Sequence, residues 1–572
     1  MTGLEMDIDP LNDIAKDSYH VSAPERRWVL WFALVVMTIT TLPFLIGYAS
    51  QGTDHRFTGF VIGVEDGNSY VAKMLTGTYG AWLFRSPYTV YPQKGMLTFL
   101  PYLLLGKLAA PPGLHEQLVA LFHLFRIVAG ILEMLATYDF MAFFLHSIRA
   151  RRLGVALITL GGGLGWLLVL FGQQDWLGSL PLDFYSPETF GFLGLYGVPH
   201  LALARALVLW TLLAFMKVVV KELHATSKED PQKSTRSFAI GKVSLLWLLA
   251  GLIQPLDTIE IGLVIIWYMI GMVVWQVLQR VRRDTIHWFT WYRLIRFTLL
   301  AGFLPGIFAL YNAWMYFRDP YVTSWMSQSM LRSPHPLHYL VAFGLILPYA
   351  CFGGRFLLRH KPIIGWLLVG WVVLLPVLAY LPINVQRRLP DGIWVAWVTL
   401  AMVALEEWTV RTDANRAWRR LLPFAPICLL FLSTLFLLAG SFKLVFRTAP
   451  PIFRQVEEVA VFEWIGSNAR PGSVVLTSFE TGNPLPAWAP ANVLIGLGSE
   501  SINLEELQSQ VKAFYSAATT NEQRVELMRK FNVDYVFNGP AEKALGDWKP
   551  ELVQYLELVY QAGEYSLFKV IP

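Results

Sequence analysis

Two adjacent carboxylates, Glu65 and Asp66, are the residues of this 572-residue chain best suited to chemistry. They stand in the stretch VEDGNSYVAKM, residues 64–74, which follows the first long apolar run. Acidic side chains at the edge of a membrane usually serve catalysis or transport. A structural alternative stays open, because the four residues that begin at Asp66 also have the composition of a turn in which Asn68 or Ser69 caps the next helix.

The composition predicts a polytopic α-helical membrane protein. Hydrophobic residues make up 55% of the chain and charged residues only 15%, which is more apolar surface than a soluble core could bury. Runs of roughly 17 to 25 apolar residues, the length that crosses a bilayer, recur and predict about eleven transmembrane helices. The run at 243–256 is short for a span, so a broken helix that turns at Pro255 is an alternative there. We expect the helices at 28–48, 117–146, 153–171, 201–220, 243–256, 259–279, 296–317, 338–353, 363–381, 392–408 and 421–442.

The distribution of basic residues predicts the orientation of these helices. Lys and Arg collect in alternate connections, whereas the connections at 172–200 and 255–260 contain neither. Cytoplasmic connections carry the excess of positive charge in membrane proteins. We therefore expect a protein of the cell (plasma) membrane with its amino-terminal segment, residues 1–27, in the cytoplasm and its carboxyl terminus outside. The net charge of +5 follows from the basic connections, so it indicates membrane lipids and no nucleic acid as partners.

Two stretches outside the spans are expected to have structure of their own. Within a transmembrane domain at 28–445, residues 49–116 form a first outer segment whose apolar stretches are too short to span. These stretches predict helices that lie in the membrane interface. After about residue 445 the long apolar runs stop, and strand-like segments alternate with helical ones. This order predicts an extracytoplasmic α/β domain with a mainly parallel sheet at 446–572.

Basic side chains on the predicted outer side are candidates for binding an anion. Arg387 and Arg388, in PINVQRRLPDG, form an Arg-Arg pair outside the membrane, against the prevailing charge bias. They could anchor lipid headgroups, or their forked guanidinium groups could bind phosphate oxygens. Arg85 and Lys94 in the first outer segment are weaker candidates.

The outer connection at 172–200 supplies acidic residues and a histidine without any cation. Asp183, Glu188 and His200 could complete an acceptor site or a metal site. Carboxylates from separate outer loops could share a divalent cation, Mg²⁺ or Mn²⁺, although no ligand spacing identifies such a site. The structural alternative is that Glu188 starts a helix and that His200 caps one at the interface.

The whole arrangement resembles the GT-C superfamily of membrane glycosyltransferases. This group includes protein mannosyltransferases, aminoarabinose transferases and oligosaccharyltransferases that use polyprenyl-linked donors. The resemblance covers most of the chain and lies in the order in which its segments follow one another, with no long diagnostic motif. Its parts are the acidic pair Glu65-Asp66 after the first span, interfacial helices with Tyr91-Pro92 and Gly106, Arg126 in HLFRIVAG, about eleven spans, and an outer carboxy-terminal domain.

The resemblance implies an inverting glycosyltransferase with a polyprenyl-phosphate-sugar donor and an extracytoplasmic acceptor, which would be a lipid, a glycan or a protein. A polyprenyl phosphate is already a good leaving group, so the enzyme would need a base and no general acid. Asp66 is the expected base, with Glu65 beside it. Arg387 and Arg388 would meet the charge that develops on the departing phosphate.

Two other classes of function stay open. Carboxylates near the membrane, such as Asp257 and Glu260, are also what a transporter or flippase for a lipid-linked or anionic substrate would use. Transporters often have two related halves, and this chain has no convincing internal repeat, while its large first outer segment favours the enzyme. The third class is an inactive relative of the enzyme that serves as a scaffold.

Overall fold

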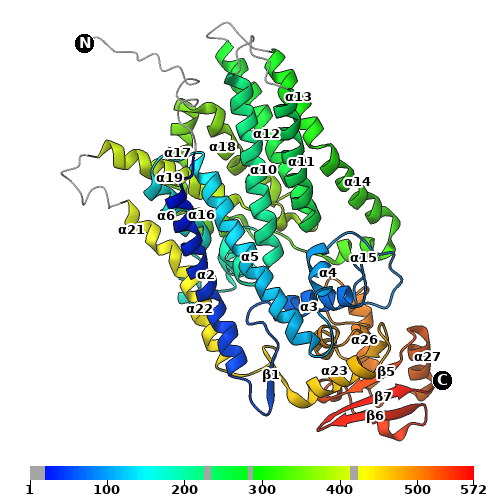
Figure 1. Ribbon diagram of the computed structural model, residues 1–572. Helices are drawn as coiled ribbons and strands as arrows, with labels where there is room; N and C mark the ends of the chain where they lie inside the picture. The colour runs from blue at the N-terminus through cyan, green and yellow to red at the C-terminus, as the bar shows by residue number, and fades with distance from the viewer. Residues whose placement is uncertain (1–19, 225–232, 281–287, 413–422, 572) are drawn as a thin grey trace, which may run out of the picture. The chain divides into compact units, whose positions relative to one another are not determined.

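The structure is a computed structural model that describes residues 20–224, 233–280, 288–412 and 423–571. The described residues leave out 1–19, which are most of the expected cytoplasmic segment 1–27. They also leave out 225–232, 281–287 and 413–422, which belong to connections rich in Lys and Arg. The chain is mainly helical (Figure 1) and forms two compact units, which are described separately. The first unit contains Met1–Thr38, Arg126–Tyr311 and Leu331–Leu437, and the second contains Ile39–Phe125, Asn312–Met330 and Leu438–Pro572.

Among the described residues, seven helical stretches are long and apolar enough to cross a membrane. This length and composition identify a membrane protein. The stretches are α2 (Ala23–Ala49), α5 (Leu114–Ala142), α10 (Pro199–His224), α12 (Pro255–Arg280), α18 (Pro362–Ala379), α19 (Ile393–Arg411), and α21 (Phe424–Cys428) continued by η3 (Leu429–Phe431) and α22 (Leu432–Val445).

Two further expected spans are bent pairs of helices. α13 (Trp288–Ala301) meets α14 (Phe303–Arg318) at 49°, and α16 (Pro336–Phe343) meets α17 (Leu347–His360) at 79°. Pro305 and Pro348 lie in the first turn of α14 and α17, where a proline fits a new helix but cannot continue the hydrogen bonds of the preceding one. Counting each pair as one span gives up to nine within the described residues.

The remaining two of the eleven expected spans are not single long apolar helices. Residues 153–171 form the end of α6 (Ile148–Leu160) and the short α7 (Gly165–Leu170), with three glycines between them. Residues 243–256 form the end of α11 (Lys233–Ile253), which stops before Pro255, where α12 begins. The turn at Pro255 is therefore the broken arrangement that the sequence allowed. Hydropathy alone does not reveal these breaks.

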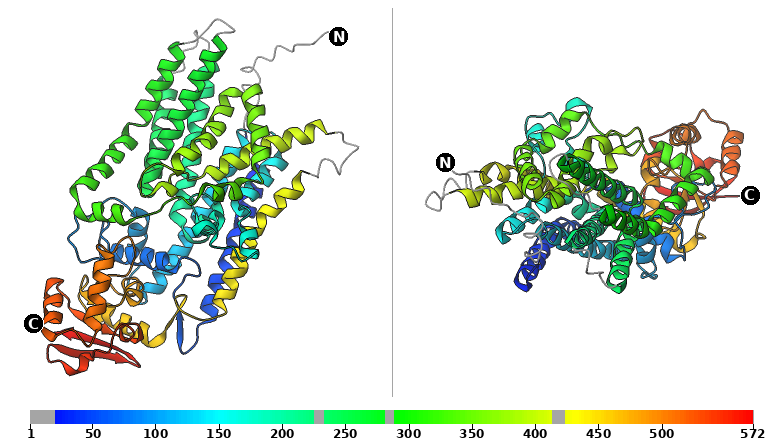
Figure 2. Two further views of the ribbon diagram at one scale, coloured as in Figure 1. Left: turned by 180° about the vertical axis from the view of Figure 1, so that it is seen from behind. Right: turned by 90° about the horizontal axis from the view of Figure 1, so that it is seen from above.

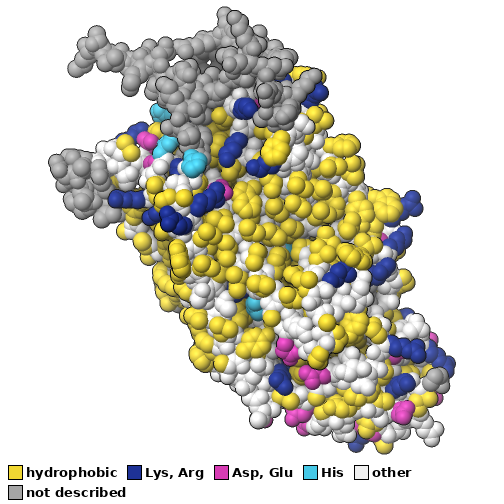
Figure 3. Space-filling view, viewed as in Figure 1, with side chains coloured by type: hydrophobic (Ala, Val, Ile, Leu, Met, Phe, Trp, Pro, Cys, Tyr) yellow, Lys and Arg dark blue, Asp and Glu magenta, His cyan; other side chains and the backbone are white. Residues whose placement is uncertain are grey.

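The first unit is a helical bundle in which α10, α11, α12 and α13 pack side by side (Figures 1 and 2). Its α19 is buried along its length, from Ile393 to Leu405. Figure 3 shows hydrophobic side chains covering the face over α5 and α12. Val128 of α5 and Ile266 and Ile270 of α12 are among the exposed hydrophobic residues. Such a face suits contact with lipid. The unit also has the short elements η1 (Trp176–Gly178), α8 (Leu182–Tyr185), α9 (Gly191–Gly197) and η2 (Gln386–Arg388).

In the second unit, the helices α3 (Val64–Thr78) and α4 (Leu100–Gly106) pack against each other. Glycines allow their backbones to approach, because a side chain at Gly77 would overlap the carbonyl oxygen of Leu103, and one at Gly106 would overlap that of Met74. The unit also contains α15 (Pro320–Gln328) and an antiparallel pair of β1 (His55–Phe57) with β2 (Phe453–Gln455).

The carboxy-terminal part of the second unit is built on a five-stranded sheet of order β4-β3-β5-β7-β6. β3 pairs in parallel with β4 and β5, and the antiparallel hairpin β6-β7 completes the sheet after a turn at Gly563. A core that includes Leu476, Val536 and Phe514 lies between sheet and helices. The elements are β3 (Val474–Leu476), β4 (Asn492–Val493), β5 (Tyr535–Asn538), β6 (Leu556–Ala562), β7 (Tyr565–Val570), α23 (Val456–Asn468), α24 (Phe479–Gly482), α25 (Leu485–Trp488), α26 (Leu504–Tyr515), α27 (Asn521–Lys530), α28 (Pro540–Lys543) and η4 (Pro550–Leu552).

Candidate functional site

The acidic pair lies in the first turn of α3, whose other residues are mostly buried. Glu65 and Asp66 are exposed, whereas Val64 and the residues from Gly67 to Leu75 are buried. The helix thus presents two carboxylates at its amino-terminal end, where the helix dipole favours negative charge.

The local sequence explains why α3 begins where it does. Gly63 precedes the helix in the left-handed conformation, with φ of 62°, which glycine adopts at little cost. The alternative of a turn from Asp66 with Asn68 or Ser69 as the cap is wrong, because α3 already begins at Val64. Gly67 is accommodated inside the helix because the ring of Phe60 fills the space of its missing side chain.

The surroundings of Glu65 change its acidity. Partial burial, and after it the charge of Asp66, raise the pKa of the Glu65 carboxyl above its ordinary value. Adjacent carboxylates in such a position can accept a proton or orient a polar hydrogen of a bound molecule.

α3 is anchored at two positions to the carboxy-terminal part of the second unit. Near its start, Asn68 Nδ2 donates a hydrogen bond to Asn483 Oδ1 at 2.8 Å. Further along, the buried Lys73 Nζ lies 2.7 Å from Glu500 Oε1 and 4.5 Å from the centre of the Phe99 ring. The sequence gives no sign of this ion pair, because the two partners are more than 400 residues apart.

The two weaker cation candidates are engaged within the second unit. Arg85 donates from Nε to the carbonyl of Gln93 at 3.3 Å and from Nη2 to that of Lys94 at 3.1 Å. Lys94 Nζ donates to the carbonyl of Arg318 at 2.9 Å. These contacts hold the loop between α3 and α4, which gives both side chains a structural role.

Arg387 and Arg388 lie in the η2 turn of the first unit, and their contacts differ. The guanidinium of Arg387 stacks over the Tyr185 ring at 4.5 Å, and Arg388 Nε lies 3.4 Å from Glu188 Oε1. Both side chains are half-buried. Within the described residues Arg387 has no ion pair, so its charge is the less neutralised of the two.

Asp183 is buried and fastens the break between α6 and α7. Its Oδ2 accepts hydrogen bonds from the backbone N–H groups of Gly163 and Gly165, at 3.1 and 3.2 Å, and from the Ser433 hydroxyl. Burial raises the pKa of the Asp183 carboxyl, although these hydrogen bonds oppose the rise. A side chain at Gly165 would overlap Asp183 Oδ1. Asp183 and the glycines between α6 and α7 therefore have a structural role, because together they stabilise the break between the two helices.

Glu188 and His200 are also buried in the first unit. Glu188 accepts a hydrogen bond from Ser186 Oγ at 3.4 Å, in addition to its pair with Arg388. His200 lies in the first turn of α10. In the parts of the chain that the structure describes, no group of three or more His, Cys, Asp or Glu side chains is placed to hold a metal ion. Asp183, Glu188 and His200 therefore do not fit a shared metal site.

A buried ionic cluster in the helical bundle was anticipated only in part, because the sequence drew attention to Asp257 and Glu260 and not to the charged residues beside them. Arg205 of α10 pairs with Glu133 of α5 at 2.9 Å and with Asp391, just before α19, at 2.8 Å. Asp257 and Glu260, on α12, are each 1% exposed and lie on the same buried side of the bundle as this cluster. The signal was present in the sequence, since charged residues inside apolar helices are costly and mark polar sites.

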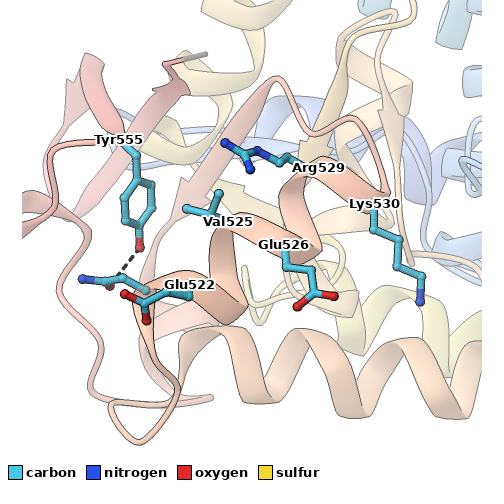
Figure 4. Close-up of a pocket in the computed structure, with 7 residues that line it drawn as sticks. Glu522, Val525, Glu526, Arg529, Lys530 and Tyr555 are labelled. Carbon is cyan, nitrogen blue, oxygen red and sulfur yellow. Dashed lines mark hydrogen bonds between the residues drawn. The ribbon is translucent and has the colours of Figure 1, made fainter.

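A solvent-open hollow lies beside α27, where the Tyr555 hydroxyl donates a hydrogen bond to Asn521 Oδ1 at 3.0 Å (Figure 4). None of the site residues expected from the sequence lines it. Its charged side chains are exposed and of both signs, so we assign it no role. Its lining residues are Asn521, Glu522, Val525, Glu526, Arg529, Lys530 and Tyr555.

No protein-family model matches the sequence, and no curated protein matches it. Solved structures do match over most of the chain. The apo oligosaccharyltransferase of Archaeoglobus fulgidus is 12% identical, with a TM-score of 0.52 over 90% of this chain and 69% of that one. The arabinofuranosyltransferase AftD from Mycobacteria is 12% identical, with a TM-score of 0.54 over 97% of this chain, which spans 40% of AftD. ArnT from Cupriavidus metallidurans, bound to undecaprenyl phosphate, is 12% identical, with a TM-score of 0.48 over 93% of this chain and 97% of that one.

The first two matches have TM-scores above 0.5 and extend over nine-tenths or more of this chain. At 12% identity they concern the path of the backbone. Both proteins are membrane enzymes of the GT-C type. The chain therefore has the GT-C fold.

Proposed function

We propose that the protein is a glycosyltransferase that moves a sugar from a polyprenyl-phosphate-linked donor to an extracytoplasmic acceptor. The observation that carries the proposal is the exposed carboxylate pair at the start of a buried helix, in a chain with the GT-C fold. The two neighbours with TM-scores above 0.5 are named as an oligosaccharyltransferase and an arabinofuranosyltransferase, which supports sugar transfer as the reaction class. The transferred sugar is a hexose or a pentose.

The proposed chemistry is a single inverting displacement. An acceptor hydroxyl or amide attacks the anomeric carbon of the donor sugar. The bond between that carbon and the phosphate oxygen breaks as the new bond forms, and its electron pair leaves with the polyprenyl phosphate. The Asp66 carboxylate takes the acceptor proton, and Glu65 supports it by orienting the acceptor. The leaving group needs no protonation, so no general acid is invoked.

Arg387 and Arg388 are the proposed cations for the donor phosphate. A guanidinium group offers paired N–H donors that match phosphate oxygens, and fixed positive charge stabilises the negative charge that develops as the phosphate departs. Arg387 is the stronger candidate of the two, because Arg388 already lies beside the Glu188 carboxylate. Arg85 and Lys94 are secondary candidates because backbone carbonyls already engage them.

Transport of a lipid-linked or anionic substrate is the second candidate function. The observation that favours it is the pair Asp257 and Glu260, two carboxylates that are each 1% exposed within the helical bundle. Carboxylates at this depth are common on transport pathways. The enzyme remains the better proposal because its candidate base is exposed and available to a substrate.

The proposal is tested with purified full-length protein in lipid and a panel of radiolabelled polyprenyl-phosphate sugars. Wild-type protein should transfer sugar to an acceptor, and Asp66→Asn should lower kcat by about 10² to 10⁴-fold, the usual contribution of a general base. Glu65→Gln should have a smaller effect. A parallel reaction with EDTA shows whether a divalent cation is required, since the described residues form no metal cluster.

Asp54→Asn is the matched control, because Asp54 is an exposed acidic residue of the same outer segment but lies outside α3. It should retain the wild-type kcat. Unchanged transfer by a folded Asp66→Asn variant would contradict the assignment of the base. Absence of transfer with every donor, together with substrate-dependent flux across the lipid, would favour the transporter.

A further inference from the structure

We propose that Asn483 is a positioning residue of the active site and that the carboxy-terminal part of the second unit sets the orientation of the carboxylates on α3. The inference rests on the proposed function, because it assumes that Asp66 is the base. Asn483 lies more than 400 positions from Asp66 in the sequence, in the loop between α24 and α25.

All hydrogen-bonding groups of the Asn483 side chain are directed at two segments. Oδ1 accepts from Asn68 Nδ2 at 2.8 Å, while Nδ2 donates to the carbonyl of Gly496 at 3.0 Å and to that of Glu65 at 3.4 Å. Asn483 is 4% exposed, so water cannot easily replace these partners. One amide therefore joins the first turn of α3 to the segment after β4.

The sequence around Asn483 is suited to this contact. A side chain at Gly482 would overlap the carbonyl oxygen of Ile495, and one at Gly496 would overlap that of Gly482. The two glycines let these backbone segments approach closely, which brings the Asn483 amide beside the Gly496 carbonyl. In addition, the buried Tyr88 hydroxyl donates to the backbone carbonyl of Asn483 at 3.0 Å. The amide is consequently held in place before it meets α3.

A second anchor fixes α3 further along its axis. Lys73 Nζ lies 2.7 Å from Glu500 Oε1 and donates to Ser69 Oγ at 2.9 Å, and Glu500 Oε2 accepts from the Ser86 hydroxyl at 2.6 Å. Asn68 and Lys73 are about 7.5 Å apart along a helix with 1.5 Å rise per residue. Two anchors at different heights resist both rotation and sliding of the helix. Asp66 lies between Glu65 and Asn68, so its direction depends on the Asn483 anchor most directly.

A carboxylate that accepts a proton in the transition state must be held in a narrow geometry, and a misplacement of about 1 Å can cost on the order of 10²-fold in rate. Gly63, which precedes α3, supplies no side-chain cap, and the amide of Asn483 donates to the backbone carbonyl of Glu65 in the first turn. Its loss should loosen that turn while the donor still binds.

The test compares Asn483→Ala with Ser478→Ala in the full-length protein in lipid. Ser478 is buried at the start of α24, the helix that ends just before Asn483, and among the described residues its hydroxyl bonds to Thr481 of that helix. Asn483→Ala should lower kcat per folded molecule by about 10 to 100-fold, with the KM for the donor within about twofold of wild type. It should also speed amide hydrogen exchange at residues 64–69. Ser478→Ala should leave kcat per folded molecule and that exchange unchanged.

Wild-type kcat in a folded Asn483→Ala variant would overturn the inference alone, and so would an equal loss in both variants, which would indicate a general effect on folding. Wild-type protein that transfers no sugar from any donor would instead overturn the proposed function, and the inference with it. The exchange measurement needs no substrate, and unchanged exchange at residues 64–69 would by itself contradict the anchoring of α3.

Discussion

At the scale of single residues, the fold buries some carboxylates among their hydrogen-bond and ion-pair partners and leaves others exposed. Asp183 accepts three hydrogen bonds from its own chain, and Glu188 lies beside Arg388. Glu65 and Asp66 instead lie exposed at the end of a buried helix. A substrate can reach an exposed carboxylate at the start of a mostly buried helix from solvent, which makes this pair the better catalytic candidate.

The two arginines of η2 differ in how far a neighbouring carboxylate neutralises their charge. Arg387→Gln should raise the KM for the donor by about tenfold or more, because a hydrogen bond to a charged group contributes about 1.5 to 3 kcal/mol. Arg388→Gln should have a smaller effect, because Glu188 already neutralises part of its charge. Steady-state kinetics with varied donor concentration measures both values. The two residues are adjacent and similarly exposed, so each variant serves as the control for the other.

A larger effect of Arg388→Gln than of Arg387→Gln would show that the ion pair with Glu188 opens when the donor binds. A wild-type KM in both variants would leave these arginines the role of anchors for lipid headgroups. Arg387→Lys adds a further distinction. It keeps the charge but loses the planar fork, so intermediate behaviour would indicate recognition of phosphate geometry.

Some of the candidate site residues have a signal that is local in the sequence, and their roles stay predictions. Asp66 and Arg387 stand out by charge against an apolar background, and that contrast is visible in a few residues. Asn483 and Glu500 could not be found in this way, because their role comes from contacts with residues more than 400 positions away. An asparagine or a glutamate in a mixed α/β segment has no distinguishing pattern until the fold is known.

At the scale of elements, the position of α3 depends on glycines that let it touch α4. Alanine normally favours a helix over glycine by about 1 kcal/mol. A side chain at Gly106, however, would overlap the backbone carbonyl of Met74, which cannot move away by changing a rotamer. Gly106→Ala should therefore destabilise the protein by about 1 to 3 kcal/mol, the usual cost of overpacking. Thermal unfolding of the full-length protein in detergent measures the change.

Gly52→Ala is the control for this prediction, since no atom lies within 4 Å of a side chain added there. It should unfold at the wild-type temperature. An unfolding temperature of Gly106→Ala equal to or above that of wild type would show that the two helices can separate without cost. Their packing would then not position α3.

Hydropathy located most of the long helices because an apolar run of sufficient length has few other solutions in a membrane. It missed the break in residues 153–171, where a carboxylate some twenty residues away accepts hydrogen bonds from the glycine backbone. It also merged the bent pairs that meet at 49° and 79° into single spans. A sliding average of apolarity contains no information on where a backbone N–H finds its partner, so breaks and bends stayed hidden.

At the scale of the whole molecule, the compact units do not follow the order of the chain. Residues 438–572 group with Ile39–Phe125 and Asn312–Met330, and long-range contacts such as Lys73 to Glu500 belong to this group. Composition changes at about residue 445, so a sequence reading divides the chain there. The division of the chain into domains at that position stays a prediction, and so does the orientation of the termini.

Orientation can be tested with single cysteines and a membrane-impermeant maleimide applied to intact cells. The background removes both native cysteines, Cys351 and Cys428, because both are exposed on the protein surface. Ser509→Cys, on the exposed side of α26, should be labelled without permeabilisation, because the excess of basic residues predicts that the carboxy-terminal part lies outside. His360→Cys, at the end of α17 among basic residues, should be labelled only after permeabilisation.

The reverse pattern would place Glu65 and Asp66 on the cytoplasmic side, because they share a compact unit with α26. An extracytoplasmic acceptor would then be impossible, whereas labelling as expected leaves these carboxylates on the side where the proposed acceptor lies.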